Sequence, residues 1–166
     1  MLELINNKTW IYFVKNPSSE VHIRELARKL KISPPSVLKQ SRGLLKLGLL
    51  KSKKQGKNVV LSANYDVGDF ITMKKWTNIF LLIDSNLVKD TQDKVSTLIL
   101  FGSFSRGEDI EKSDIDLAVD KELDINLDKY EGILNRNIQF HVINKSMGSN
   151  LKENIGQGIL LSGVAL

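Results

Sequence analysis

One short stretch of the chain concentrates residues that could bind phosphate and a metal ion. It reads LILFGSFSRGEDIEKSDIDL: an apolar run ends at Gly102 and Ser103, ten residues follow, and then come Asp114 and Asp116 with one apolar residue between them. Side chains of a strand alternate between its two faces, so both aspartates are expected on one side. The pattern predicts a pair of carboxylates near a glycine-serine bend.

Such a carboxylate pair favours binding of a divalent cation. Two nearby carboxylates repel each other, and the pKa of at least one rises unless a cation lies between them. Mg²⁺ accepts one or two carboxylates together with substrate phosphates. Gly102 lets the backbone approach a phosphate, the Ser103 hydroxyl can donate to it, and Arg106 offers a planar fork of donors. The stretch therefore predicts a site for a nucleoside triphosphate and Mg²⁺.

The same residues resemble a known family. Gly-Ser, ten residues and Asp-x-Asp are similar to the signature of the nucleotidyltransferase superfamily related to DNA polymerase beta, and GSFSRGEDIEKSDIDL is most similar to its minimal nucleotidyltransferases. The closing stretch LKENIGQGILLSG also resembles that family, so the resemblance covers about residues 90–166. It implies transfer of a nucleotide monophosphate from a nucleoside triphosphate to an acceptor hydroxyl. Asp114 and Asp116 would be the catalytic metal ligands. The implied nucleotide-binding residues are Gly102, Ser103, Arg106 and Ser113.

The sequence departs from this family at a third acid. In the family that acid lies on a later strand, but the matching strand here reads Ile138-Gln139-Phe140-His141-Val142. The positions expected to face the site are Gln139 and His141, and neither is a carboxylate. His141 could act as a base, since its unperturbed pKa is about 6.5, or it is a polar residue on a half-exposed strand.

Charge divides the chain into two parts. Residues 1–65 hold 13 Lys/Arg and 3 Asp/Glu, a net of +10, whereas residues 66–166 hold 11 Lys/Arg and 16 Asp/Glu, a net of −5. The split predicts modules with different partners, a basic one suited to phosphates and an acidic one suited to cations. We expect a first domain over 1–65, a linking helix over 66–90 and a nucleotidyltransferase domain over 91–166.

The basic part resembles a DNA-binding module. Helical periodicity is expected over 2–15 and 21–30, a third helix should begin at Ser33 and end near Gly48, and strand-like runs 49–53 and 58–62 form a hairpin. This order is similar to the winged-helix modules of small prokaryotic regulators. The leucines of the third helix (Leu38, Leu44, Leu45 and Leu47) are expected to be buried. The residues expected to meet double-stranded DNA are Ser36, Lys39, Gln40 and Lys46 on the opposite face and Lys53, Lys54 and Lys57 on the hairpin.

The acidic part alternates strand and helix signals. Strands are predicted at 95–101, 115–119, 138–143 and in the closing run 159–166. Helices are predicted at 127–134 and 150–156, after one continuous amphipathic helix over 69–90. The fold class is therefore α+β: an N-terminal winged helix followed by a small α/β nucleotidyltransferase domain with a mixed sheet.

Composition narrows the function classes. The chain has no cysteine and two histidines, which excludes disulfides and makes a zinc site unexpected. No apolar run reaches the ~18 residues of a membrane span, and the first residues show no signal peptide, so we expect a cytoplasmic protein. One hypothesis is an enzyme that modifies a protein, nucleic acid or small molecule, for example an antitoxin that modifies its toxin. The other is a homodimeric DNA-binding regulator or antitoxin whose degenerate transferase domain binds nucleotide without turnover.

Overall fold

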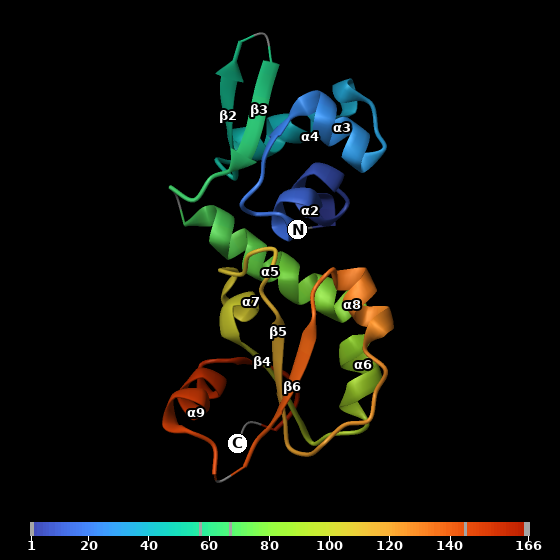
Figure 1. Ribbon diagram of the computed structural model, residues 1–166, viewed down its shortest axis with the longest axis vertical. Helices are drawn as coiled ribbons and strands as arrows, with labels where there is room; N and C mark the ends of the chain where they lie inside the picture. Colours follow the sequence, from blue (N-terminus) through green and yellow to red (C-terminus); the bar gives the residue numbers. More distant parts are fainter. Residues whose placement is uncertain (1, 57, 67, 145, 165–166) are drawn as a thin grey trace. The chain divides into compact units, whose positions relative to one another are not determined.

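The chain divides into two compact units, and the boundary between them falls within one helix. The computed structural model describes residues 2–56, 58–66, 68–144 and 146–164. Unit 1 spans Met1–Lys74 and unit 2 spans Lys75–Leu166 (Figure 1). No helix within the described ranges is both long and apolar enough to cross a membrane.

Unit 1 combines helices with a small antiparallel sheet. Its strands are arranged in the order β1-β3-β2. The predicted hairpin is confirmed as β2 and β3. The elements are α1 (Leu2–Ile5), α2 (Lys8–Lys15), β1 (Glu20–His22), α3 (Ile23–Leu30), α4 (Pro34–Lys46), β2 (Leu50–Gln55) and β3 (Asn58–Ala63).

Local signals set the ends of α4. The Ser33 hydroxyl accepts a hydrogen bond from the backbone N–H of Ser36 at 3.3 Å, so Ser33 caps the helix that was predicted to begin there. Pro34 occupies the first helical position, where a missing N–H costs nothing. Gly48 follows the helix with φ of 70°, a left-handed conformation that glycine adopts without strain.

Three expectations for unit 1 were wrong in detail. The helix predicted over 2–15 is divided, because Asn7 caps a new helix by accepting from the Trp10 N–H at 3.0 Å. The segment predicted to begin a helix at Val21 instead forms β1, where Val21 pairs with Leu61 and is buried. Leu38 and Leu47 are 42% and 61% exposed, so only part of the leucine face of α4 is buried.

Unit 2 is built on a four-stranded sheet in the order β6-β5-β4-β7. The β4 strand is antiparallel to β5 and β7, whereas β5 and β6 are parallel, so the predicted mixed sheet and α+β class are confirmed for this part. The elements are the end of α5 (Asp69–Asp84), α6 (Leu87–Gln92), β4 (Thr97–Phe101), α7 (Gly102–Arg106), β5 (Ile115–Val119), α8 (Asp128–Leu134), β6 (Ile138–Val142), α9 (Ser149–Gly156) and β7 (Ile159–Gly163).

The continuous helix predicted over 69–90 is wrong. The chain breaks at Asn86, whose φ of 67° lies in the left-handed region that a helix cannot continue through. The Ser85 hydroxyl stabilises the break by donating to the Leu82 carbonyl at 2.6 Å and accepting from the Leu87 N–H at 3.3 Å. The apolar residues keep a helical period through both α5 and α6, so the sequence pattern does not indicate the break between them.

Asp120 closes the end of β5 against the start of β4. Its carboxylate accepts the N–H groups of Ser96 at 2.8 Å and Thr97 at 3.1 Å. Desolvation raises the pKa of Asp120. The hydrogen bonds from Thr97, from Ser96 and from the backbone N–H of Asp120 itself lower it by more, so this pKa lies below its usual value. This clamp fixes the register that places Phe101 opposite Asp116 at the other end of the pair.

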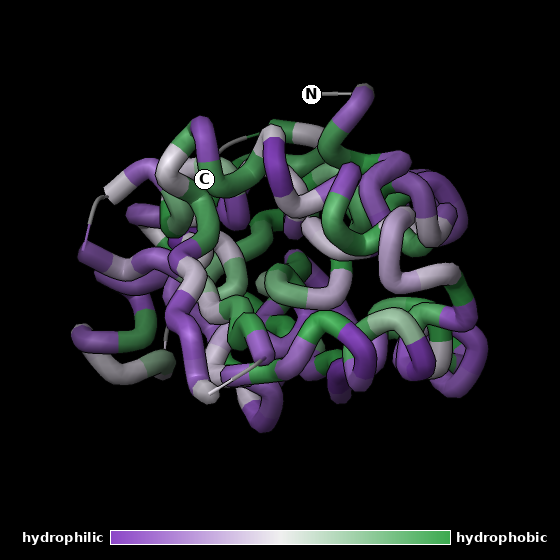
Figure 2. Tube along the Cα trace, turned by 90° about the horizontal axis from the view of Figure 1, so that it is seen from above, coloured by the Kyte–Doolittle hydropathy of each residue, from purple (hydrophilic) through white to green (hydrophobic). Residues whose placement is uncertain are grey.

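The two faces of the unit 2 sheet differ in chemistry. One face belongs to the larger core, which includes Leu98, Leu117 and Ile138 and is covered by α6 and α8 (Figure 1). By strand alternation the other face carries Phe101, Asp116 and the residues in register with them, and α9 lies on this side. We call it the Asp116 face. The tube in Figure 2 alternates between hydrophobic and hydrophilic stretches, as expected of elements with one buried side.

Candidate active site

Gly102 and Asp116 meet at the centre of the candidate site. Gly102 follows β4 with φ of 73°, a conformation that favours glycine. A Cβ atom at this position would lie 2.5 Å from Oδ2 of Asp116, closer than real contacts allow. Gly102 of the Gly-Ser motif therefore leaves room for Asp116, the second aspartate of the Asp-x-Asp motif.

Asp114 is held by two amide side chains from the β6 region. Its Oδ1 accepts from Asn137 Nδ2 at 3.2 Å, and its Oδ2 accepts from Gln139 Nε2 at 2.5 Å. Gln139 is in register with Asp116 on the parallel strand, so these contacts draw Asp114 toward the Asp116 face. A carboxylate offers about four lone-pair sites, and two neutral donors leave capacity for a cation.

His141 contacts the other aspartate. Its Nε2 lies 3.1 Å from Oδ1 of Asp116, and both side chains are 28% exposed. Its ring also makes an edge contact with Phe101, with centroids 5.1 Å apart. Gln139 and His141 thus both occupy the Asp116 face, and each contacts one aspartate.

The remaining predicted nucleotide-binding residues lie around α7. Ser103 is partly exposed in the first turn of α7. Arg106 is exposed at its end, where Nε donates to Glu108 Oε2 at 2.7 Å. The Ser113 hydroxyl accepts from the Ile110 N–H at 3.0 Å and closes the turn before Asp114. The geometry thus gives Ser113 a loop-forming contact, while phosphate binding by these residues stays a prediction.

A buried polar network supports the loop between the two motifs. Asp109 accepts from Asn78 Nδ2 at 2.7 Å and pairs with Arg136 Nη2 at 3.4 Å. The Asp109 and Arg136 side chains are 1% and 2% exposed. Asn78 Nδ2 also donates to the Phe104 carbonyl, and Arg136 Nη1 to the Asn135 carbonyl. The network ties α5, α7 and the start of β6 to the loop that presents Asp114.

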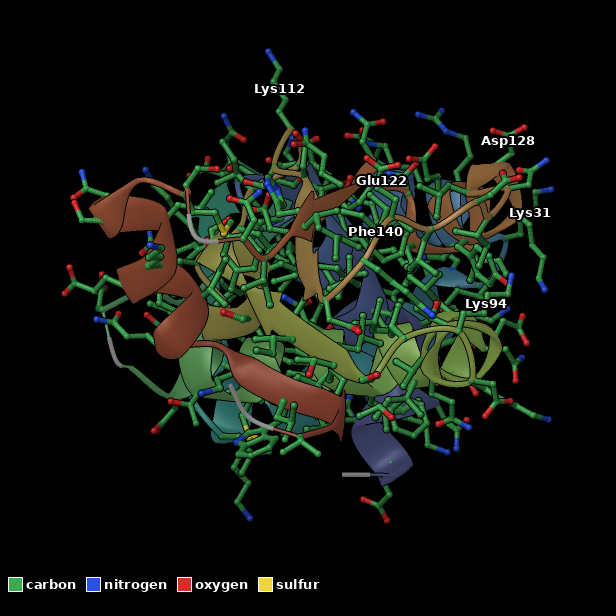
Figure 3. All side chains as sticks on the ribbon, turned by 90° about the horizontal axis from the view of Figure 1, so that it is seen from below. Lys31, Lys94, Lys112, Glu122, Asp128 and Phe140 are labelled. Atoms are coloured by element: carbon green, nitrogen blue, oxygen red, sulfur yellow. The ribbon has the colours of Figure 1, made fainter. Side chains whose placement is uncertain are left out.

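A polar hollow of about 320 Å³ borders Asp114. Glu131 on its wall accepts the first N–H of β6, from Ile138, at 2.8 Å, and so connects α8 to the start of that strand. Lys112 projects outward from the preceding loop (Figure 3). The residues that line the hollow include Lys112, Ser113, Asp114, Glu131, Asn135 and Asn137.

The donor set suits one hard cation rather than a closed metal cage. Within the described ranges no group of three or more His, Cys, Asp or Glu side chains forms a metal-binding cluster. Asp116 nevertheless offers carboxylate oxygens beside Gly102, and Asp114 offers a second carboxylate two positions earlier in the chain. Mg²⁺ commonly completes such a partial set with water and substrate phosphates. The residues present therefore fit a magnesium ion that shares its coordination with a nucleotide.

Comparison with known proteins agrees with this geometry. Residues 85–163 match the family model described as Polymerase beta, Nucleotidyltransferase. This part of unit 2 is therefore similar to a nucleotidyltransferase domain. The match includes both motifs and the strand that bears Gln139 and His141. No curated protein and no solved structure matches the chain.

Asn137 is a site residue that the sequence reasoning missed. It lies one position before β6, as Asp114 lies one position before β5, and the parallel pair places Ile115 opposite Ile138. The two polar residues are therefore neighbours at the same edge of the sheet. A parallel pairing of the two predicted strands would have revealed this, but the sequence alone did not specify it.

The predicted DNA-binding residues of α4 do not share one exposed face. Gln40 is turned toward α2, because its Oε1 accepts the Thr9 N–H at 3.0 Å. Ser36 is engaged at the N-cap, with its hydroxyl 2.9 Å from that of Ser33. Lys39 and Lys46 are exposed, and so is Arg42 between them, which was not predicted from the sequence. The exposed basic residues of α4 are Lys39, Arg42 and Lys46.

The hairpin residues are exposed but divide between two sides. Lys53 pairs with Val60 and Lys54 with Val59 in adjacent registers, so their side chains leave opposite faces of β2. Lys57 lies outside the described residues.

We expect Gly102→Ala to disrupt the site while leaving the sheet intact. The added Cβ would force the Asp116 carboxylate to move, and a misplacement of about 1 Å can cost about 100-fold in activity. Gly132→Ala is the matched control, since nothing lies within 4 Å of its Cβ position in α8. Nucleotide transfer and Mg²⁺-dependent nucleotide binding measure the effect, and circular dichroism verifies the fold. Full function in Gly102→Ala would show that this contact is not needed.

Proposed function

We propose that unit 2 transfers a nucleotide monophosphate from a nucleoside triphosphate to an acceptor hydroxyl in the presence of Mg²⁺. The observation that carries this proposal is the contact between the two motifs, in which Gly102 leaves space against the Asp116 carboxylate. In the reaction the acceptor oxygen bonds to the α-phosphorus, the bond to the β-phosphate breaks, and pyrophosphate leaves. The acceptor hydroxyl loses its proton.

Each residue of the site then has a distinct task. Asp114 and Asp116 would hold the magnesium ion, which supplies charge neutralisation for the phosphates. Gly102 and Ser103 admit the triphosphate at the start of α7. Gln139 and Asn137 orient Asp114, whereas His141 orients Asp116 and would take up the proton of the acceptor hydroxyl. The polar hollow beside Asp114 offers the acceptor side a hydrogen-bonding wall.

Label transfer tests this function. The purified chain is incubated with Mg²⁺ and each α-labelled nucleoside triphosphate, with candidate protein, nucleic-acid and small-molecule acceptors. We expect label in one acceptor class together with release of pyrophosphate. Nucleotide binding without transfer to any acceptor would contradict enzymatic activity.

A second candidate function is a nucleotide sensor. It is favoured by one observation: the positions expected for a third acid hold Gln139 and His141, and each is already bonded to an aspartate. Two-metal chemistry uses more anionic ligands than this pair provides. In that case Mg²⁺-dependent nucleotide binding would regulate unit 1 or a protein partner, such as a toxin, without turnover.

Unit 1 is proposed to bind double-stranded DNA. The support is the net charge of residues 1–65 and the exposed basic residues Lys39, Arg42 and Lys46, which recur at helical spacing on α4. A helix with such a face can enter a major groove. Most such modules act as dimers, so a homodimer belongs to this proposal.

We expect Lys39→Ala combined with Arg42→Ala to weaken DNA binding about tenfold and to reduce its dependence on salt. Each lost phosphate contact lowers the slope of log affinity against log salt by about 0.9. Mobility shift at several salt concentrations measures both effects. The control is Lys94→Ala with Lys121→Ala, which removes the same charge from exposed positions of unit 2. Equal weakening by both pairs would indicate an effect of net charge alone.

A further inference from the structure

A second cavity lies on the same sheet face as Asp116. It has a volume of about 310 Å³ between β4, the end of β6 and α9, and we call it the α9 pocket. Its walls are mainly apolar, and among the described residues that line it Lys152 is the charged one. The lining includes Ile99, Ile143, Met147, Lys152, Ile155 and Leu160.

The α9 pocket has a fixed floor. Ile99 and Ile155 are 8% and 6% exposed and belong to the small core on this side of the sheet. At Gly158, just after α9, a Cβ atom would lie 2.5 Å from Cγ2 of Ile99 and 2.8 Å from the Leu100 carbonyl oxygen. This close approach holds the end of α9 against β4, so the cavity is formed before any ligand arrives.

The pocket lies a short step from the candidate catalytic residues. Ile99 is opposite Ala118, two positions along β5 from Asp116, which is about 7 Å of extended chain. His141 is in register with Ala118, and its ring packs against Phe101. On the Asp116 face the carboxylate of Asp116 and the aliphatic side chain of Ile99 therefore lie in adjacent rows of residues.

We propose that the α9 pocket receives the nucleobase of the nucleoside triphosphate whose phosphates meet Gly102 and Asp116. This inference rests on the proposed function, because it extends the same site. A nucleoside triphosphate carries an anionic tail at one end and a flat ring with two apolar faces at the other, so the tail suits a magnesium ion held by Asp116 and the ring suits the apolar walls of the pocket. Binding sites of this size typically have apolar walls and few polar groups, as here.

Selective filling of the pocket tests the assignment. Leu160→Trp is the first variant, because Leu160 lines the pocket yet is 42% exposed and can change without opening the core. Met147→Trp is the second, from a partly buried position on the opposite chain segment. Asn154→Trp is the matched control, since it adds the same ring at an exposed position of α9. Two ligands are titrated with Mg²⁺: the nucleoside triphosphate that binds best, and inorganic tripolyphosphate.

We expect the wild-type chain to bind the nucleotide more tightly than tripolyphosphate. Leu160→Trp and Met147→Trp should weaken nucleotide binding by about tenfold or more, while the affinity for tripolyphosphate and both affinities of Asn154→Trp stay unchanged. Unchanged nucleotide affinity in both filled variants would overturn the inference and leave the proposed function standing. The same holds if the filled variants bind nucleotide normally and lose only the transfer of label to the acceptor. Failure of the wild-type chain to bind either ligand would overturn the proposed function and this inference with it.

Discussion

Asp116→Asn should lower nucleotide transfer by about 1,000-fold. The asparagine has the shape of the aspartate and keeps an oxygen for His141, but it lacks the charge that would hold magnesium beside the phosphates. Metal-assisted charge stabilisation is worth several kcal/mol, and every 1.36 kcal/mol of barrier is about tenfold in rate. The measurement is the initial rate of label transfer at saturating nucleotide and Mg²⁺.

The control for this variant is Asp124→Asn. It makes the same chemical change at an exposed position after β5, and we expect the wild-type rate. Nucleotide binding must be measured in parallel. A nucleotide sensor has no transfer rate, so in a sensor Asp116→Asn would lower only the Mg²⁺-dependent affinity for nucleotide. Transfer that persists at the wild-type level would show that the chemistry occurs elsewhere on the chain.

Those strands whose side chains alternate in polarity could be predicted from the sequence. The bounds predicted for β5 are those observed, because Ile115 and Leu117 are fully buried while Asp116 between them is partly exposed. The short helix α7 was not predicted, since its five residues carry no helical period. β1 was mistaken for helix because its one apolar residue, Val21, continues into the apolar pattern of α3.

The candidate site could be predicted where one motif held its members or where the family resemblance indicated the facing positions, as for Gln139 and His141. The encounter of Gly102 with Asp116 joins two parts of a single signature, and the register of β4 with β5 brings them together. The amide contacts of Asp114 come from residues more than twenty positions away, and they depend on a parallel pairing that no local pattern encodes. Gln40 shows the same limit, since only tertiary packing turns it toward α2.

Burial of Asp109 and Arg136 was also invisible in the sequence, and it leads to the largest stability effect that we expect. Charged residues are almost never fully buried unless they are paired, and nothing local in the sequence indicates this pair. In the structure both are buried, and they connect the loop before Asp114 to the residues that precede β6. Removing one partner of such a pair leaves a charge in a poorly solvated environment.

Asp109→Leu should therefore destabilise unit 2 by about 3–5 kcal/mol. Urea unfolding followed by circular dichroism measures the loss, and hydrogen exchange of the β5 amides identifies the unit that unfolds. Glu108→Ala is the control: it removes the neighbouring exposed pair with Arg106, which should contribute no more than about 1 kcal/mol.

The double variant Asp109→Leu with Arg136→Met separates the cost of an uncompensated buried charge from the cost of altered packing. If the destabilisation comes from an uncompensated buried charge, replacing both partners with apolar residues should recover most of it, because the desolvation penalty disappears with the charges. The double variant should then be stable yet still impaired in transfer, since the loop that presents Asp114 has lost its polar ties. Recovery of stability and transfer together would show that the network serves folding alone, and equal instability of the single and double variants would show that packing dominates at this position.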